Sequence, residues 1–143
     1  MKIDVYTKED INKVLTTFMG VEHRLEYVNT VNNRTFYNDT EATNIKCTQI
    51  ALSSFEEPTI IILGGLERGQ NFNDLAPYMK NVKAILAIGQ CRKRVVDFAK
   101  DNGKLVYEYE YLKDAILKAY EISQENDIIL LSPASASWDQ YKQ

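Results

Sequence analysis

Three short, wholly apolar segments restrict what this chain can fold into more than any other feature of its sequence. They lie at 59–63, 84–88 and 128–131, and none of them contains a charged residue. Segments with helical patterning separate them, at about 73–80, 92–100 and 112–122, and a short strand-like segment lies at 105–107. Strands that are apolar along their whole length are typical of a parallel sheet that helices cover on both faces.

The part of the chain before the first apolar strand predicts a hairpin between two helices. Residues 24–28 alternate apolar and polar side chains, Asn32-Asn33 is a turn signal, and residues 35–37 return as the partner strand. A capping pattern at 7–10, followed by apolar residues at helical spacing, predicts a helix that ends at Gly20. The helix after the hairpin carries Ile45, Ile50, Leu52 and Phe55.

The expected fold is therefore α/β, a Rossmann-like three-layer sandwich whose mostly parallel sheet begins with an N-terminal antiparallel hairpin. The 143 residues fit one domain. We expect residues 1–20 to form a linker and an N-terminal helix, and residues 21–143 to form the domain itself.

The composition excludes several classes of function. Seventeen basic and twenty acidic residues give a net charge of −3, so we expect neither nucleic acid nor an anionic membrane as a partner. Two cysteines outside any CxxC pair and a single histidine do not supply the ligands of a structural zinc site. No apolar run approaches the length of a membrane span, and the N-terminus has no signal-peptide pattern. These features predict a cytoplasmic protein.

Three polar, small-residue segments follow predicted strands, at 39–44, 64–69 and 132–137. In open α/β sheets ligands bind outside the carboxyl ends of the strands, so we expect these loops to form the site. Asp39 is suited to accept hydrogen bonds from sugar hydroxyls, Gly64-Gly65 lets the backbone approach a ligand closely, and Arg68 offers a planar fork for a carboxylate.

Each loop also has an explanation that needs no ligand. An Asx turn with Thr43 as N-cap would account for the first loop, and a strand-ending turn with a solvated Arg68 for the second. A tight turn under a neighbouring helix would explain the small residues of the third. The chain contains neither GxxxxGK[ST] nor GxGxxG, so it has no known glycine loop for a triphosphate or a dinucleotide.

Four motifs, taken in this order, resemble the C-terminal domain of the Mur ligases, and in particular the branch that adds D-glutamate. They are GVEHRLEYV at 20–28, FYNDTEATN at 36–44, GGLERG at 64–69 and LLSPASASWDQY at 130–141. The resemblance covers essentially everything from about residue 7 onward. It implies an ATP-dependent ligase of peptidoglycan precursor synthesis, which joins D-glutamate to UDP-N-acetylmuramoyl-L-alanine through an acyl phosphate and forms ADP.

Carried over position by position, the resemblance implies binding roles and no catalytic group in this chain. Arg24 would contact the nucleotide phosphates of ATP and Asp39 its ribose. Thr43, Arg68 and Ser137 would hold the carboxylates of D-glutamate. The P-loop and the Mg²⁺ sites would belong to a central domain that this chain lacks, so we expect the chain alone to be inactive.

Some residues depart from the family pattern. Thr40 and Glu41 stand where a serine and a lysine are usual, and Ser135 stands where cysteine is commoner. A Glu41 carboxylate that faced the substrate would repel it. Two alternatives to the D-glutamate ligase stay open on the sequence: a non-enzymatic Rossmann-like ligand-binding domain, and a domain of a sister Mur ligase or a folylpolyglutamate ligase.

Overall fold

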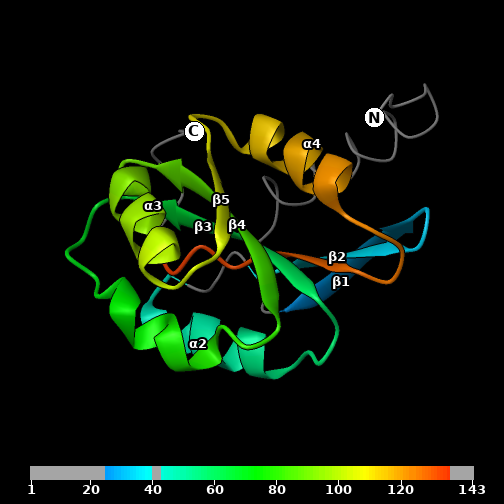
Figure 1. Ribbon diagram of the computed structural model, residues 1–143, viewed down its shortest axis with the longest axis horizontal. Coiled ribbons are helices and arrows are strands. Elements are labelled where there is room, and N and C mark those ends of the chain that lie inside the picture. The colour runs from blue at the N-terminus through cyan, green and yellow to red at the C-terminus, as the bar shows by residue number, and fades with distance from the viewer. Residues whose placement is uncertain (1–24, 40–42, 136–143) are drawn as a thin grey trace.

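The computed structural model describes residues 25–39 and 43–135. These residues form a six-stranded sheet with the strand order β1-β2-β6-β3-β4-β5, flanked by helices (Figure 1). The strands are β1 (Glu26–Val31), β2 (Arg34–Asn38), β3 (Thr59–Gly65), β4 (Val82–Gly89), β5 (Leu105–Glu108) and β6 (Ile128–Leu131). The helices are α2 (Ile45–Ser53), the 3₁₀ helix η1 (Phe72–Tyr78), α3 (Arg92–Asp101) and α4 (Leu112–Ile122).

The predicted sheet is confirmed. Only the β1–β2 pair is antiparallel among the described strands, whereas β2–β6, β6–β3, β3–β4 and β4–β5 are all parallel. Asn32 and Asn33, both with positive φ, form the two-residue turn of the hairpin, as asparagine tolerates that conformation. The first strand begins at Glu26, two residues later than the alternating pattern predicted.

Two apolar clusters lie on opposite faces of the sheet and explain why the central strands are apolar throughout. Ile60 and Ile62 of β3 pack in the cluster that contains the buried side of α4. Ile61 and Leu63 pack in the other cluster, with α2, η1 and α3. Because alternate residues of a strand point to opposite faces, burial of both faces requires an apolar side chain at every position.

The helices differ from the prediction in three details. The segment expected to be a helix at 73–80 is a 3₁₀ helix, and it contains Pro77, which cannot donate to an α-helical ladder. The helix α2 ends at Ser53, so Phe55 lies beyond it and packs on the ring of Tyr37, with centroids 4.8 Å apart. Ile50 of α2 is 59% exposed and does not belong to the core. The helix and linker predicted before residue 21 lie outside the described residues.

Candidate functional site

The loops after β2, β3 and β6 meet at the carboxyl edge of the sheet. These strands are neighbours in the order β2-β6-β3, and main-chain hydrogen bonds join their ends. The amide of Asp39 donates to the carbonyl of Leu131 at 2.8 Å, and the amide of Gly64 donates to the carbonyl of Pro133 at 2.9 Å. The predicted convergence of three loops at one edge is confirmed for the residues that the structure describes.

Asp39 is the buried centre of the first loop. It is 2% exposed, and its two carboxylate oxygens accept hydrogen bonds from the amide of Leu25 and the hydroxyl of Ser132, both at 2.9 Å. Ser132 in turn lies 3.1 Å from the hydroxyl of Thr48 on α2. Asp39 therefore orders the hairpin, the α2 helix and the β6 loop relative to one another. Its predicted contact with a ribose stays a prediction.

Thr43 is exposed at the start of α2, but it is not the residue that caps the helix. Asn44 is the N-cap: its side-chain oxygen accepts a hydrogen bond from the amide of Cys47 at 3.0 Å. The interpretation of Thr43 as N-cap was wrong by one residue, because both residue types favour this position. Thr43 directly precedes the N-cap, at the end of α2 where the positive end of the helix dipole attracts anions.

Arg68 occupies the middle of the loop between β3 and η1 and is exposed. Its main-chain amide donates to the side chain of Gln70 at 3.0 Å, and the amide of Gly69 donates to the carboxylate of Glu67 at 2.9 Å. The Arg68 guanidinium forms no hydrogen bond or ion pair with any residue in the described ranges. The N–H donors of this guanidinium therefore face solvent and can bind an anion.

Gly64 and Gly89 allow the ends of β3 and β4 to pack closely. A Cβ on Gly64 would lie 2.2 Å from the carbonyl oxygen of Ile88, and one on Gly89 would lie 2.4 Å from the Cα of Gly65. Both glycines also have positive φ. The missing Cβ of Gly64 therefore admits the backbone of β4, and the close approach of a ligand to Gly64-Gly65 stays a prediction.

The sequence did not reveal the residues that hold the Arg68 loop in place. Arg94 on α3 forms an ion pair with Glu67, with 2.6 Å between Nη2 and Oε2. The side-chain hydrogen bond from Arg94 lowers the pKa of Glu67, so the carboxylate stays ionised to a lower pH than an isolated glutamate does. Gln70 lies between this loop and the loop after β6. No local signal marks Gln70 or Arg94, because their partners come from other elements.

Cys91 is a buried thiol behind the same loops. It receives a hydrogen bond from the amide of Gly65 at 3.3 Å, and its sulfur lies 3.8 Å from the hydroxyl of Ser135. Burial raises the pKa of the Cys91 thiol. Cys47, by contrast, is only half-buried on α2. The two cysteines therefore differ in their access to solvent.

We expect a thiol reagent such as Ellman's reagent to modify one cysteine per folded chain quickly and the second only after unfolding. The thiolate is the reactive form, and Cys91 is both buried and shifted toward the protonated thiol. A Cys47→Ser variant should lose the fast phase, and a Cys91→Ser variant should keep it. Equal rates for the two thiols in the native protein would contradict the burial of Cys91.

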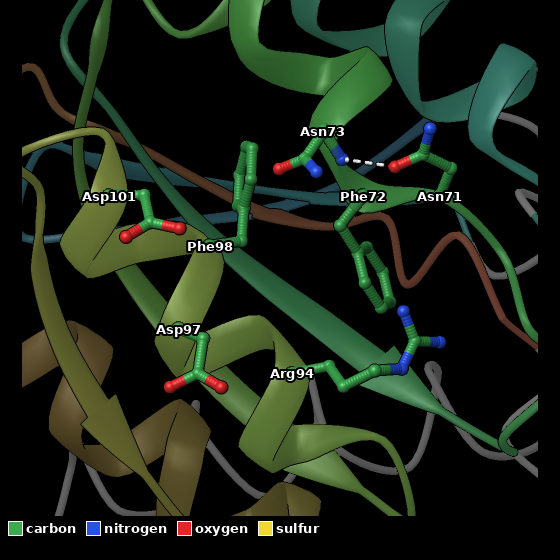
Figure 2. Close-up of a pocket in the computed structure, with 7 residues that line it drawn as sticks. All are labelled: Asn71, Phe72, Asn73, Arg94, Asp97, Phe98 and Asp101. Carbon is green, nitrogen blue, oxygen red and sulfur yellow. Dashed lines mark hydrogen bonds between the residues drawn. The ribbon is translucent and has the colours of Figure 1, made fainter.

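A hollow of about 200 Å³ lies between η1 and α3, and the Arg94 side chain that contacts the Arg68 loop forms part of its lining (Figure 2). Figure 2 shows Asp97 and Asp101 on the α3 side and Phe72 beside the Arg94 guanidinium. The residues that line it are Asn71, Phe72, Asn73, Arg94, Asp97, Phe98 and Asp101. A second hollow of about 40 Å³ is lined by Leu25, Asp39, Cys47, Ile50 and Ala51, beside the first loop.

The described residues contain no group of three or more His, Cys, Asp or Glu side chains that could hold a metal ion. Within the same ranges, no helix has both the length and the apolar character needed to cross a membrane. Arg24 and Ser137, two of the predicted binding residues, lie outside the described residues, as does Glu41.

Comparisons with known proteins identify the family. The family model for the Mur ligase glutamate ligase domain matches residues 23–135. The chain is 52% identical over 137 residues to UDP-N-acetylmuramoylalanine–D-glutamate ligase from Bacillus thuringiensis (strain Al Hakam), and 51% identical to the protein of the same name from Bacillus cereus (strain G9842). In both cases the match covers 95% of this chain and 30% of the relative, so the chain spans less than a third of these curated relatives.

Solved structures show the same fold. A murein peptide ligase from Psychrobacter arcticus superposes with a TM-score of 0.58 at 15% identity, over 81% of this chain and 28% of that one. A UDP-N-acetylmuramate–alanine ligase from Thermotoga maritima gives a TM-score of 0.55 at 19% identity, over 84% and 28%. The family match and the 52% identical relatives together show that this chain belongs to the Mur ligase family and is a glutamate ligase domain of that family.

Proposed function

We propose that this chain is the amino-acid-binding domain of a longer ATP-dependent ligase, which joins D-glutamate to UDP-N-acetylmuramoyl-L-alanine in peptidoglycan precursor synthesis. The relatives that bear this name and are 52% identical support the reaction and favour it over a non-enzymatic binding domain or a sister ligase. In this proposal residues 21–143 form the domain, residues 1–20 lead into it, and the ligase works in the cytoplasm.

The observation that carries the proposed site is the exposed Arg68 guanidinium, which has no partner among the described residues, at the edge where three loops meet. An anionic amino acid needs donors that have no partner of their own, and Arg68 offers a planar pair of them. Thr43 lies at the start of α2 on a neighbouring loop, where an anion is favoured by the helix dipole. We assign the carboxylates of D-glutamate to Thr43, Arg68 and Ser137.

The chemistry of the proposed reaction explains why fixed carboxylate contacts matter. The amine of D-glutamate must attack an acyl phosphate, and ADP and phosphate leave as products. Two anchored carboxylates restrict how the amine is aimed, and orientation of this kind can supply several kcal/mol of barrier lowering, up to about 7–11 kcal/mol in well-oriented systems. This domain would position the nucleophile and close over the site, with no catalytic group of its own.

ATP and Mg²⁺ complete the proposal. Arg24 would contact the phosphates of ATP, and Asp39 would accept a hydrogen bond from the ribose. None of the described residues belongs to a group of three or more His, Cys, Asp or Glu side chains that could hold a metal ion. We assign the metal and most of the nucleotide contacts to other domains of the longer ligase.

Phosphate release by the full-length ligase, measured with ATP, UDP-N-acetylmuramoyl-L-alanine and a panel of amino acids, tests this function. We expect D-glutamate to support turnover well above L-glutamate, L-alanine or diaminopimelate. We also expect the 143-residue chain alone to release no phosphate from ATP, because it has no P-loop. Preference for another amino acid would refute the substrate assignment. ATP turnover by the pure chain would refute the assignment of ATP hydrolysis to other domains of the ligase.

A further inference from the structure

Gln70 joins two of the three loops of the site through a single side-chain amide. Its nitrogen donates to the carbonyl of Ala134 at 3.3 Å and to the hydroxyl of Ser135, and it also lies 3.3 Å from the carbonyl of Leu66. Its oxygen accepts from the main-chain amide of Arg68 at 3.0 Å. Gln70 thus contacts Arg68 on one side and the loop at 132–135 on the other.

Arg94 holds the same loop from the helix behind it. Its Nε and Nη2 donate to the two carboxylate oxygens of Glu67, at 3.0 and 2.6 Å, and its Nη1 donates to the carbonyl of Gln70 at 2.8 Å. Nη2 also lies 3.1 Å from the side-chain oxygen of Gln70. The guanidinium stacks 5.0 Å from the ring centroid of Phe72, toward which it extends in Figure 2. Arg94 therefore binds the loop at residues 67 and 70, on both sides of Arg68.

Hydrogen bonds hold the tip of this loop: besides the contacts of Gln70 and Arg94, the amide of Glu67 donates to the side chain of Gln90 at 3.1 Å. Glu67, Arg68 and Gly69 are all exposed, so apolar packing does not fix them. Ordering an exposed loop when a ligand arrives costs conformational entropy, which subtracts from the binding free energy. A loop that is already held by hydrogen bonds avoids that cost and presents its ligand-binding group in a constant place.

We propose that Gln70 and Arg94 are positioning residues, which fix the Arg68 loop against the 132–135 loop so that the Arg68 guanidinium meets a carboxylate of D-glutamate from a constant place. The inference rests on the proposed function, since it takes D-glutamate as the ligand. Neither residue touches the substrate in this account. Gln70 and Arg94 act through the conformations of the two loops that do.

The test is Gln70→Glu in the full-length ligase. The substitution keeps the size of the side chain and an acceptor for the Arg68 amide, but it replaces the donor with a carboxylate oxygen that faces the carbonyl of Ala134. We expect the KM for D-glutamate to rise on the order of tenfold, since small misplacements of binding groups have effects of that size or larger. The KM values for ATP and UDP-N-acetylmuramoyl-L-alanine should stay unchanged; a smaller folded fraction would lower the apparent kcat and would not raise the KM for D-glutamate.

Gln49→Glu is the matched control. Gln49 also donates its side-chain amide to a carbonyl, that of Asp74 at 2.8 Å, but it links α2 to η1 and does not contact the Arg68 loop. We expect its KM for D-glutamate to equal that of the wild type. Arg94→Lys is the second variant: a lysine keeps the charge but cannot hold Glu67 and the Gln70 carbonyl together, so the KM for D-glutamate should rise less than in Arg94→Ala.

Amide hydrogen exchange in the 143-residue chain gives a readout that does not depend on activity. The amides of Arg68 and Gly69 should exchange faster in Gln70→Glu and Arg94→Lys, whereas amides of the central strands should not. Suppose that the wild type uses D-glutamate and that Gln70→Glu and Arg94→Lys both keep its KM for D-glutamate. That result would overturn the positioning role and leave the proposed function intact. A wild-type enzyme that does not use D-glutamate would instead refute the proposed function, and this inference with it.

Discussion

Replacing Arg68 with alanine is expected to raise the KM of the full-length ligase for D-glutamate on the order of 100-fold. A bidentate contact between a guanidinium and a carboxylate consists of two charge-assisted hydrogen bonds, each with a net value of about 1.5–3 kcal/mol. Losing about 2.7 kcal/mol corresponds to a hundredfold change. Steady-state kinetics with D-glutamate as the varied substrate measure this effect, with ATP and the UDP-linked substrate saturating.

The same substitution should leave the fold unaffected. The Arg68 guanidinium has no partner among the described residues, and substitutions at such surface positions usually change stability by less than about 0.5 kcal/mol. Arg68→Lys should lose much less affinity than Arg68→Ala, because it keeps the positive charge. Lys113→Ala, at an exposed position on α4, should behave as wild type. An Arg68→Ala enzyme with an unchanged KM for D-glutamate would remove Arg68 from the site.

Replacing Gly89 with alanine is expected to destabilise the folded chain by about 3 kcal/mol or more. The added methyl group would lie 2.4 Å from the Cα of Gly65, which is main chain and cannot rotate away. The residue also has a φ of +79°, a conformation that costs an L-residue about 1–2 kcal/mol even without a clash. Overpacking adds about 1–3 kcal/mol to this. Urea denaturation followed by circular dichroism measures the difference in unfolding free energy.

Gly103→Ala separates the two contributions to that loss. Gly103 has a similar φ of +68°, but nothing lies within 4 Å of a Cβ built on it. We therefore expect a loss of about 1–2 kcal/mol at Gly103, from the backbone conformation alone. Gly64→Ala should resemble Gly89→Ala, because its Cβ would lie 2.2 Å from the carbonyl oxygen of Ile88. Equal losses at Gly89 and Gly103 would show that the two strand ends are not packed as closely as described.

Most of the fold follows from the sequence because the apolar pattern reports burial directly. The strands β4 and β6 and the helices α3 and α4 appear where the apolar runs and the helical spacing placed them. The hairpin turn at Asn32-Asn33 could be predicted equally well, since few residues other than asparagine and glycine adopt positive φ readily. Ile50 was misleading because helical spacing alone does not show how much of a helix surface the rest of the protein covers.

The candidate site was less predictable, since its geometry depends on contacts between distant segments. The order β2-β6-β3 puts the three loops side by side, and strand order does not follow from local pattern. The pair Gly64-Gly65 signals a close approach of backbones, but the sequence does not say which backbone approaches. Gln70 and Arg94 were missed altogether, because an isolated glutamine and an arginine on a charged helix have no distinguishing context.

A crystal structure of the full-length ligase with bound D-glutamate tests most directly whether these loops form an amino-acid site. We predict one carboxylate of D-glutamate within about 2.7–2.9 Å of the Arg68 guanidinium, with the ligand at the edge formed by the loops after β2, β3 and β6. D-glutamate bound elsewhere, for example in the hollow between η1 and α3, with Arg68 still facing solvent, would contradict the account.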